Sequence, residues 1–419
     1  MIVVDKIRFS ARQFQSRFAE MAAIGLLREP EGKRYALCMR HPFDTIAAAL
    51  YVRERDGSIL LLHPDTPPDK AVAQAEQAGC MALIYQEWDR VLPLAVQSSD
   101  LAADPALCQF SSGTTGEPKL IRRSWNDVRT ETEHYNLALQ AHSGEQPVIL
   151  VPVSHSFGLI AGVFAAFERK AEPIIVFDKN PKFAAHIVHT TASSIVYTVP
   201  FLIHLLLSFS ADLCMHKVIT SGSPLTSPLL ARLSQQANEL WQQYGCSEVG
   251  CISLGANPGR VTDVGRPLGH LQVGTSTTEA DRQGELIVTY RGRPVHTGDA
   301  GYFDSDHRLH VVGRIDDMIN VSGLKVLPSE VETVIGEHPG VAEVVVHKTA
   351  HGVWGEAVKA WIVLAAPFTL TTAELKAWCM LHLPPYKVPT VFHVVRDIPK
   401  TPAGKISRKL LQDEELKSG

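Results

Sequence analysis

The sequence has no long uncharged apolar run and no marked excess of charge of either sign. No apolar run approaches the ~18 residues that a membrane-spanning helix needs. Lys and Arg total 40 and Asp and Glu total 44 among 419 residues, a formal net charge of −4. This balance favours neither nucleic acid nor an anionic membrane as the main partner. We expect a monomer or a homodimer.

Paired cysteines and several common catalytic motifs are also missing. The seven cysteines are scattered and form no CxxC pair, which is typical of free thiols in a reducing cytoplasm. The first residues include Asp5 and Lys6 and lack the apolar core of a signal peptide, so we expect a cytoplasmic protein. The chain has no G-x-S-x-G, no G-x-G-x-x-G after a strand and no zinc-ligand spacing, which argues against a serine hydrolase, a dinucleotide-binding domain and a structural zinc site.

Apolar periodicity predicts an α/β protein with a large N-terminal domain. Residues 12–27 have helical spacing, residues 58–62 resemble a strand, and residues 69–79 resemble a helix that a glycine ends. The middle of the chain holds three apolar, β-branched runs, at 148–153, 173–177 and 194–199. Buried strands separated by helices predict α/β subdomains with a mainly parallel sheet.

The predicted secondary structure changes twice in the second half of the chain. After about residue 258 glycines are frequent and strands short, as at 284–288, which predicts a β-rich section. Helix-like and strand-like segments then alternate in the last hundred residues, at 329–336, 341–347, 357–364 and 372–382. This length suffices for a small domain. We place the main boundary near Asp316, with residues 1–315 as the N-terminal domain and 316–419 as a small α+β C-terminal domain.

A glycine-rich loop at 110–119, with the sequence FSSGTTGEPK, is the most informative stretch of the chain. Glycines let backbone N–H groups approach an anion closely, the hydroxyls add donors, and Lys119 adds a mobile positive charge. These features suit a polyphosphate, although such a stretch also occurs in flexible surface turns. The loop is not the P-loop of kinases and GTPases, because Pro118 precedes the lysine and Leu120 follows it.

The glycine-rich loop resembles the signature loop of the adenylate-forming superfamily, which includes acyl- and aryl-CoA synthetases, adenylation domains of nonribosomal peptide synthesis, and luciferases. Further motifs follow in the order that the family has. The resemblance implies a compact stand-alone member that binds ATP and Mg²⁺, with no fused carrier domain. It assigns these loop residues to the phosphates of ATP: Ser112, Gly113, Thr114, Thr115, Gly116 and Lys119.

Two motifs resemble the elements that border the nucleoside of ATP. Residues 220–225 resemble the adenine-side loop, which assigns Gly222, Ser223 and Pro224 to ATP binding and Gly222 also to the acid. Residues 296–302, with the sequence HTGDAGY, resemble the T-G-D motif, in which Asp299 accepts hydrogen bonds from the ribose hydroxyls. Taken alone, residues 220–225 would be interpreted as an ordinary turn, and Asp299 would be a plausible β-turn aspartate.

QYGCSE resembles the family's Y-G-x-T-E motif. The resemblance implies that Tyr244 stacks on adenine and that Gly245 and Ser247 contact ATP. It also implies that Glu248, which would serve catalysis, binds Mg²⁺ together with Thr114. The alternative is that Tyr244 lies in the core and that Glu248 is a solvated surface charge, which the ordered set of motifs disfavours.

Residues 313–323, with the sequence GRIDDMINVSG, resemble the hinge motif about which the small domain rotates in the family. By this resemblance Arg314 contacts ribose or phosphate, and Asp316 is the hinge of a mobile C-terminal domain. Gly323 lies on the segment that would line a tunnel for the thiol acceptor. Asn320 stands where lysine is more usual in the family. Without the resemblance, this stretch would be taken as a linker.

PKTPAGKISRK, near the end of the chain, resembles the last motif of the family. Basic tails are usually solvated, but here Lys405 falls on the position of the family's catalytic lysine. An ammonium between a carboxylate and the α-phosphate would neutralise charge on both anions as they approach.

The acid is expected to bind between Val151 and Glu248. The sequence VPVSHSFG resembles the segment that borders the substrate in aryl-activating members, which places His155 near the carboxylate and assigns it to catalysis as well as to substrate binding. Ser156 stands where amino-acid-activating members have an aspartate, so an α-amino acid is disfavoured. Tyr197 and Phe201 either form an aromatic wall of the acid site or belong to the core.

These motifs together predict ATP-dependent activation of a carboxylic acid to an acyl-adenylate, with release of pyrophosphate, and transfer of the acyl group to a thiol. The acid is expected to be aromatic or otherwise small, although a fatty acid stays open. The acceptor is the pantetheine thiol of CoA or of a separate acyl carrier protein. The alternatives are an ATP-dependent phosphotransferase and a catalytically inactive ATP-binding protein of the same fold.

Overall fold

The computed structural model describes residues 1–95, 104–110, 119–210, 212–277, 283–399 and 411. Most of the glycine-rich loop, Ser112 to Gly116, and the predicted catalytic Lys405 lie outside these ranges. Among the residues described, no helix is long and apolar enough to cross a bilayer.

The first part of the chain forms a six-stranded sheet in the order β6-β5-β3-β4-β7-β8. The central strands are parallel, and antiparallel β6 and β8 flank them. The strands are β3 (Arg34–Met39), β4 (Ser58–Leu61), β5 (Ala82–Gln86), β6 (Val91–Pro93), β7 (Ala106–Phe110) and β8 (Leu120–Ser124). The helices are α1 (Ala11–Ala23), α2 (Pro42–Arg53) and α3 (Pro68–Gln77). The predicted helix 12–27 is shorter in the structure, because the chain leaves the helix at Ile24 and makes a 3-10 turn over Gly25–Leu27.

The middle of the chain forms a nine-stranded sheet in the order β15-β14-β13-β12-β11-β9-β10-β1-β2. Six adjacent strands, β13 to β1, run parallel as predicted, and the strands at both ends are antiparallel. The strands are β1 (Ile2–Val4), β2 (Ile7–Phe9), β9 (Gln146–Ile149), β10 (Ile174–Ile175), β11 (Ser194–Thr198), β12 (Met215–Thr220), β13 (Ala237–Cys246), β14 (Gly250–Ala256) and β15 (Arg266–Pro267).

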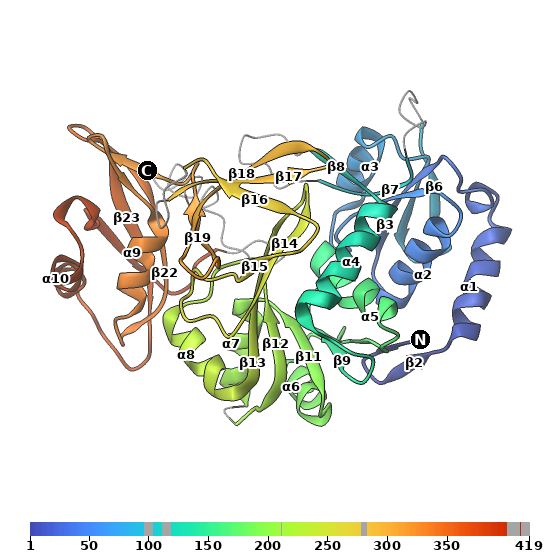
Figure 1. Ribbon diagram of the computed structural model, residues 1–419, viewed down its shortest axis with the longest axis horizontal. Helices are drawn as coiled ribbons and strands as arrows, with labels where there is room; N and C mark the ends of the chain where they lie inside the picture. Colours follow the sequence, from blue (N-terminus) through green and yellow to red (C-terminus); the bar gives the residue numbers. More distant parts are fainter. Residues whose placement is uncertain (96–103, 111–118, 211, 278–282, 400–410, 412–419) are drawn as a thin grey trace.

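Helices cover both faces of this sheet (Figure 1). The outer face packs on α6 (Pro181–Thr190), α7 (Pro200–Phe209) and α8 (Ser227–Gln236). The inner face packs on α4 (Trp125–Leu139), a π-helix over Phe157–Phe164, and α5 (Ala165–Glu168). The largest core cluster combines residues of both sheets with α1, α2, α4 and the π-helix, so the main core lies between the sheets.

The β-rich section predicted after residue 258 is an antiparallel sheet in the order β16-β17-β18-β19. Its strands are β16 (Gln272–Thr275), β17 (Gly284–Tyr290), β18 (Arg293–Phe303) and β19 (Leu309–Arg314). Its own apolar cluster includes residues of the β13–β14 hairpin, such as Tyr244 and Ile252. The section is therefore packed against the nine-stranded sheet through that hairpin.

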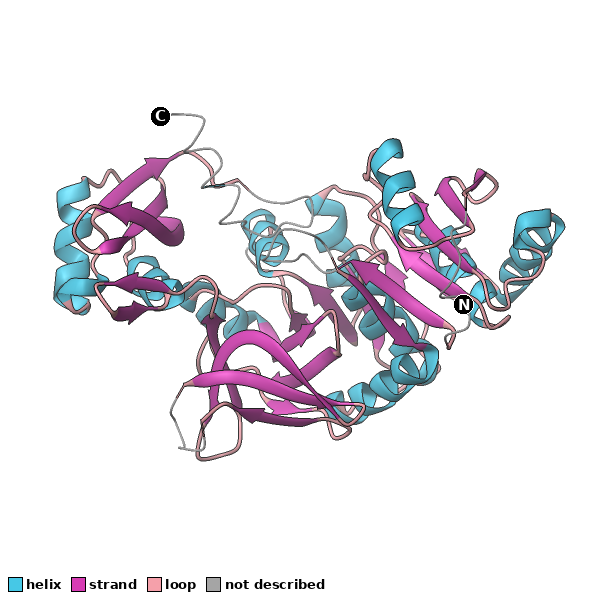
Figure 2. Ribbon diagram, turned by 90° about the horizontal axis from the view of Figure 1, so that it is seen from above, coloured by secondary structure: helices cyan, strands magenta, loops and turns pink. Residues whose placement is uncertain are grey.

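The small C-terminal domain lies at one end of the molecule (Figure 2). Its helices are α9 (Pro328–Gly336) and α10 (Thr372–His382), and its strands are β20 (Ile319–Val321), β21 (Leu324–Val326), β22 (Val341–His351), β23 (Gly355–Leu364) and β24 (Val391–Val395). One apolar cluster joins both helices to the sheet. The Ser329 hydroxyl donates to the carbonyl of Val312, which ties α9 to β19.

Candidate active site

The predicted site loops leave the carboxyl ends of adjacent parallel strands. Thr198 on β11 pairs with Thr220 on β12, which in turn pairs with Gln242 on β13. On the other side of β11, Tyr197 pairs with Ile149 at the end of β9. Because ligands of open α/β sheets bind outside the carboxyl ends of the strands, this register favours one shared site. The segments concerned are 150–157, 199–201, 221–224 and 243–248.

The hairpin between β13 and β14 carries the Y-G-x-T-E-like motif. Ser247 and Glu248 lie in its turn and are partly exposed. Gly245 pairs with Cys251 across a bulge in the ladder, and a Cβ on Gly245 would collide with the carbonyl oxygen of Gly250. Gly245 therefore permits a close approach of the two strands that any larger residue would push apart.

Tyr244, Asp299 and Arg314 form a hydrogen-bonded set that joins this hairpin to the β-rich section. The Tyr244 hydroxyl donates to Asp299 Oδ2 at 2.6 Å. Arg314 Nη1 donates to Asp299 Oδ1 at 3.0 Å and to the carbonyl of Thr297 at 2.9 Å. Each carboxylate oxygen can accept a second hydrogen bond. Asp299 is thus held in place and keeps acceptor capacity for a ligand hydroxyl.

Burial controls the ionisation of this set. Asp299 is 8% exposed, and burial raises the pKa of its carboxyl, although Tyr244 and Arg314 act in the opposite direction. Burial, together with the charge of Asp299, also raises the pKa of the Tyr244 phenol. The phenol is therefore a donor at neutral pH, which fixes the position of its ring.

Asp316 and Gly323 lie beyond this set, towards the small domain. Asp316 is exposed and lies 3.7 Å from Arg314, measured between Oδ2 and Nη2. Gly323 is exposed at the turn between β20 and β21, where its N–H donates to Asn320 Oδ1 at 2.7 Å. The backbone N–H of Asn320 donates to Glu356 at 2.7 Å. Asn320 thus supports the turn that carries Gly323.

The other nucleotide-side residues occupy accessible loops. Gly222, Ser223 and Pro224 are exposed between β12 and α8, and Lys119 is exposed directly before β8. Thr114 and Lys405 lie outside the described ranges, so the structure does not place them against Glu248. Within the described residues no three side chains gather that could hold a metal ion by themselves.

The acid-binding segment leads into an irregular helix. His155 is exposed and Ser156 is partly exposed, directly before the π-helix over Phe157–Phe164. π-Helices are rare and frequently lie at functional sites. Phe201, at the start of α7, is 45% exposed, whereas Tyr197 is fully buried with its ring 5.7 Å from that of Phe157. The two possible wall residues therefore occupy different environments.

A buried ion pair that the sequence did not reveal supports the β13–β14 hairpin. The side chains of Arg123 on β8 and Glu131 on α4 are 2% and 5% exposed and form a salt bridge. Glu131 Oε1 also accepts the backbone N–H of Cys251 at 2.8 Å. A Cβ on Gly250 would collide with both members of the pair. The pair therefore packs against β14, the strand that follows Glu248, and holds it in position.

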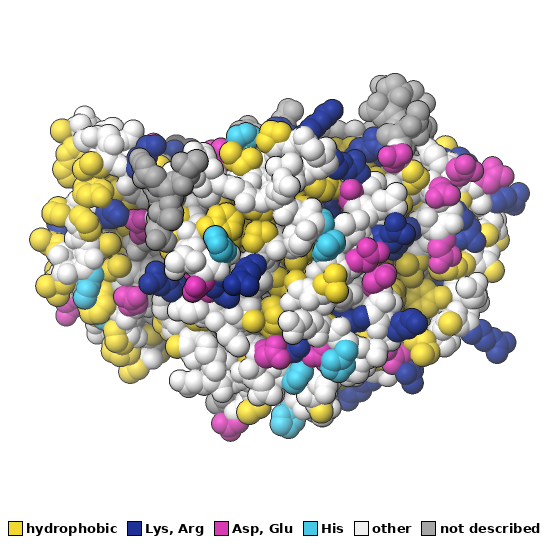
Figure 3. Space-filling view, in the orientation of Figure 1, with side chains coloured by type: hydrophobic (Ala, Val, Ile, Leu, Met, Phe, Trp, Pro, Cys, Tyr) yellow, Lys and Arg dark blue, Asp and Glu magenta, His cyan; other side chains and the backbone are white. Residues whose placement is uncertain are grey.

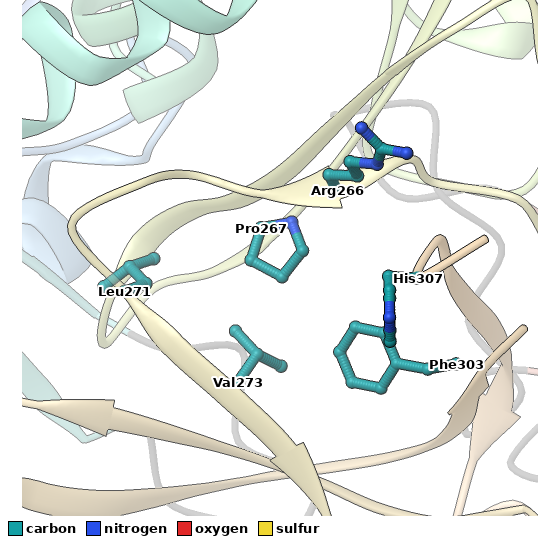
Figure 4. Close-up of a pocket in the computed structure, with 6 residues that line it drawn as sticks. All are labelled: Arg266, Pro267, Leu271, Val273, Phe303 and His307. Atoms are coloured by element: carbon teal, nitrogen blue, oxygen red, sulfur yellow. The ribbon is translucent and has the colours of Figure 1, made fainter. Parts of the chain in front are cut away.

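A separate open hollow lies on the β-rich section (Figure 4). Its lining residues are Arg266, Pro267, Leu271, Val273, Phe303 and His307. None of the predicted site residues is among them. The strand ends, rather than this hollow, are therefore the candidate active site.

Comparisons with known proteins identify the family. The family model described as "AMP-binding enzyme" matches residues 1–291, and the model described as "AMP-binding enzyme C-terminal domain" matches residues 330–405. The chain belongs to the AMP-binding enzyme family. The predicted membership of the adenylate-forming superfamily is thereby confirmed.

Relatives of this AMP-binding enzyme are acid–thiol ligases. A 3,4-dihydroxybenzoate–[aryl-carrier protein] ligase of Bacillus anthracis is 42% identical over 417 residues, which are 99% of this chain and 100% of the relative. A 2-succinylbenzoate–CoA ligase of Bacillus licheniformis is 28% identical over 348 residues, which are 74% of this chain and 70% of that protein. The chain is thus an AMP-forming ligase that activates a carboxylic acid through an adenylate, as predicted.

Solved structures confirm the predicted fold class of this AMP-binding enzyme. ATP-bound MatB from Rhodopseudomonas palustris has a TM-score of 0.86 at 18% identity and covers 99% of this chain and 95% of its own. O-succinylbenzoate coenzyme A synthetase (MenE) from Bacillus subtilis, in complex with AMP, has a TM-score of 0.83 at 20% identity, with 98% and 95% covered. The residue roles, the boundary at Asp316 and the mobility of the small domain stay predictions.

Proposed function

We propose that this enzyme adenylates a hydroxylated benzoic acid of the 3,4-dihydroxybenzoate type and passes the aryl group to the phosphopantetheine thiol of a separate aryl carrier protein. The observation that carries the proposal is the 42% identity to the 3,4-dihydroxybenzoate–[aryl-carrier protein] ligase of Bacillus anthracis over the full length of both chains. Ser156 supports an acid without an amino group, because no carboxylate stands at that position.

In the first half-reaction, a carboxylate oxygen of the acid attacks the α-phosphorus of ATP. An O–P bond forms, and the bond to the bridging oxygen of pyrophosphate breaks. Because both reactants are anions, positive charge must offset their repulsion. We assign this role to Lys405 and the binding of the leaving pyrophosphate to Lys119 and residues 112–116. Tyr244, Asp299 and Arg314 would hold the nucleoside, with Asp299 accepting hydrogen bonds from ribose hydroxyls.

Mg²⁺ fits the residues that are present. Nucleotide-bound Mg²⁺ takes most of its ligands from phosphate oxygens and water and needs only one or two carboxylates from the protein. Glu248 is partly exposed in a turn at the strand ends and supplies one such carboxylate, with Thr114 as the second proposed ligand. When bound, the ion would neutralise phosphate charge.

In the second half-reaction, the thiol sulfur attacks the carbonyl carbon of the aryl-adenylate. A C–S bond forms, the C–O bond to AMP breaks with its electron pair leaving on AMP, and the thiol proton passes to solvent. Rotation of the small domain at Asp316 would withdraw Lys405 and bring the Gly323 turn to the strand ends. Such a conformational step would separate the two half-reactions in time.

An exposed apolar surface beside Gly323 favours a protein as the thiol carrier. Leu324, Val353 and Trp354 are 50%, 83% and 42% exposed, and the Ser322 N–H donates to the Trp354 carbonyl at 3.1 Å, so the tips of two hairpins adjoin. Apolar side chains also gather along the outer side of the small domain (Figure 3). Contiguous exposed apolar surface is typical of protein-binding sites, whereas CoA is a small polar ligand.

The proposal is tested with purified enzyme, a panel of benzoic acids and two thiol acceptors. We expect pyrophosphate–ATP exchange that depends on the acid and is fastest with dihydroxybenzoates, and aryl loading of an aryl carrier protein at least ~10-fold more efficient than thioester formation with CoA, by the protein–protein contact above. Preferential use of CoA would overturn the proposed acceptor. Exchange with aliphatic acids only would overturn the proposed acid, and release of ADP would indicate a phosphotransferase instead.

A further inference from the structure

A buried phenol lies below the acid-binding segment without a well-formed hydrogen bond. Tyr197 on β11 is 0% exposed, and within the described residues its hydroxyl makes no hydrogen bond of good geometry, although Arg169 and Tyr135 are close enough to interact with it. Other fully buried tyrosines of this chain are satisfied, since the hydroxyls of Tyr35 and Tyr51 donate to the carbonyls of Leu26 and Leu27 at 2.9 and 2.8 Å. A buried polar group without a partner is rare in native proteins and calls for an explanation.

The surroundings of this phenol are polar and also incompletely satisfied. The Tyr135 hydroxyl and the Arg169 guanidinium lie near it. Arg169 Nη1 donates to Asn136 Oδ1 at 3.0 Å, but its buried Nε and Nη2 have no partner in the described part of the chain. Tyr135 donates to Gln243 Oε1 at 3.0 Å. Several polar groups thus converge at one buried place and leave hydrogen-bonding capacity unused.

This cluster lies at the candidate site and not elsewhere in the core. Tyr197 is next to the last residue of β11, and Gln243 directly precedes Tyr244 on β13. The Phe157 ring, which is partly exposed, packs against Tyr197 with the ring planes at 59°. Phe157 follows His155 and Ser156 and begins the π-helix. An aromatic pair therefore connects the accessible acid-binding segment to the buried phenol.

We propose that the Tyr197 hydroxyl and the Gln243 amide bind the ring hydroxyls of the aromatic acid and so select hydroxylated benzoic acids over benzoic acid. This inference rests on the proposed function, because it names the groups that recognise the acid. A dihydroxybenzoate carries two adjacent hydroxyls, each of which can donate and accept. It would supply the partners that the phenol and the buried guanidinium nitrogens lack.

The ionisation of Tyr197 agrees with this role. Burial raises the pKa of its phenol, while Arg169 acts in the opposite direction. At neutral pH the phenol keeps its proton, so it can donate one hydrogen bond and accept another. A site built to bond a hydroxyl discriminates strongly against an analogue that lacks it, because the polar groups are then left unpaired.

The test compares Tyr197→Phe with wild type on 3,4-dihydroxybenzoate, 3-hydroxybenzoate, 4-hydroxybenzoate and benzoate by pyrophosphate–ATP exchange. The measured quantity is the ratio of kcat/KM for each hydroxylated acid to that for benzoate. We expect wild type to prefer the dihydroxy acid and the variant to lose roughly 10- to 100-fold of that preference. Gln243→Leu should reduce the same ratio. Tyr35→Phe, which also removes one buried hydroxyl but on the first sheet, is the matched control and should leave the ratio unchanged.

An unchanged ratio in a folded Tyr197→Phe variant would overturn the inference while leaving the proposed function intact. Absence of exchange in wild type with every aromatic acid would instead overturn the proposed function itself. If Tyr197→Phe does not fold, the acid panel on wild type decides: equal kcat/KM for benzoate and the hydroxylated acids contradicts recognition of ring hydroxyls, and a preference of roughly 10-fold or more, reduced in Gln243→Leu, supports it.

Discussion

The nucleotide side and the acid side of the candidate site differ in how fully their polar groups are satisfied. On the nucleotide side, Tyr244 and Arg314 both bond to Asp299, with donor–acceptor distances of 2.6 and 3.0 Å. On the proposed acid side, the Tyr197 hydroxyl and two Arg169 nitrogens are buried and make no hydrogen bond of good geometry in the described part of the chain. The hydrogen bonds of Tyr244, Asp299 and Arg314 are formed without a ligand, whereas under our proposal the acid supplies the hydrogen bonds that the other side lacks.

The largest effect is expected from removing the positive charge of Lys405, which would contact both the nucleotide and the acid during adenylation. Lys405→Ala should slow acid-dependent pyrophosphate–ATP exchange by roughly 10²- to 10³-fold, because a preorganised charge at the transferring phosphate is lost. Thiolation of supplied aryl-adenylate should change only a few-fold. Lys409→Ala, in the same basic tail, serves as the control. Equal loss of both half-reactions in Lys405→Ala would argue against the assignment.

The second prediction concerns the buried ion pair of Arg123 and Glu131, which supports the β13–β14 hairpin on the nucleotide side. Glu131→Gln or Arg123→Met should lower the free energy of unfolding by about 3–5 kcal/mol, because each leaves a buried charge without its partner. The double variant Arg123→Met/Glu131→Leu should recover much of this loss. Urea unfolding of the four proteins measures it. Additive losses in the double variant would show that the two side chains do not act as a pair.

A smaller and more selective effect is expected at Asp299. Asp299→Asn should lower kcat/KM for ATP by roughly 10- to 100-fold, because the amide loses the charge and one acceptor that Tyr244, Arg314 and the ribose require. The KM for the acid should stay within about 2-fold of wild type, as the acid side is untouched. Steady-state kinetics with each substrate varied in turn provides the measurement. Similar changes in the kinetic constants for ATP and for the acid would contradict independent binding of the two substrates.

The smallest effect concerns pH. Because burial raises the pKa of Asp299 above its usual 3.8, the carboxylate is protonated at a higher pH than an exposed one. The folded protein therefore binds this proton more tightly than the unfolded chain does. The resulting contribution to the free energy of unfolding is present at low pH and is lost as the pH rises through the raised pKa. ATP binding has the opposite dependence, since protonation removes an acceptor. We expect kcat/KM for ATP to fall a few-fold on acidification. This acidic limb should be absent in Asp299→Asn.

The sequence was sufficient to predict the family, the fold class and several elements. Residues 372–382 form the predicted helix, which Thr371 and Glu374 cap reciprocally. Such capping depends on neighbouring residues and can be recognised locally. The parallel sheet was also predictable, because buried strands alternating with helices allow few other arrangements.

Long-range and irregular features could not be predicted in this way. Tyr244 and Asp299 are 55 residues apart, so no local pattern indicates their hydrogen bond. Arg123 and Glu131 resemble ordinary surface charges in the sequence, and only the packing of α4 against the hairpin buries them. The helix over 157–164 has a π pattern that apolar periodicity does not distinguish from an α-helix.

Adenylate formation is tested most directly by following the carboxylate oxygens of the acid. If 3,4-dihydroxybenzoate carries a heavy stable oxygen isotope in its carboxylate, one labelled oxygen should appear in the AMP released after loading of a carrier protein, with none in pyrophosphate. This transfer follows from attack of the carboxylate on the α-phosphorus and later cleavage of the bond to the carbonyl carbon. Label in inorganic phosphate, with ADP as the nucleotide product, would contradict an adenylate intermediate.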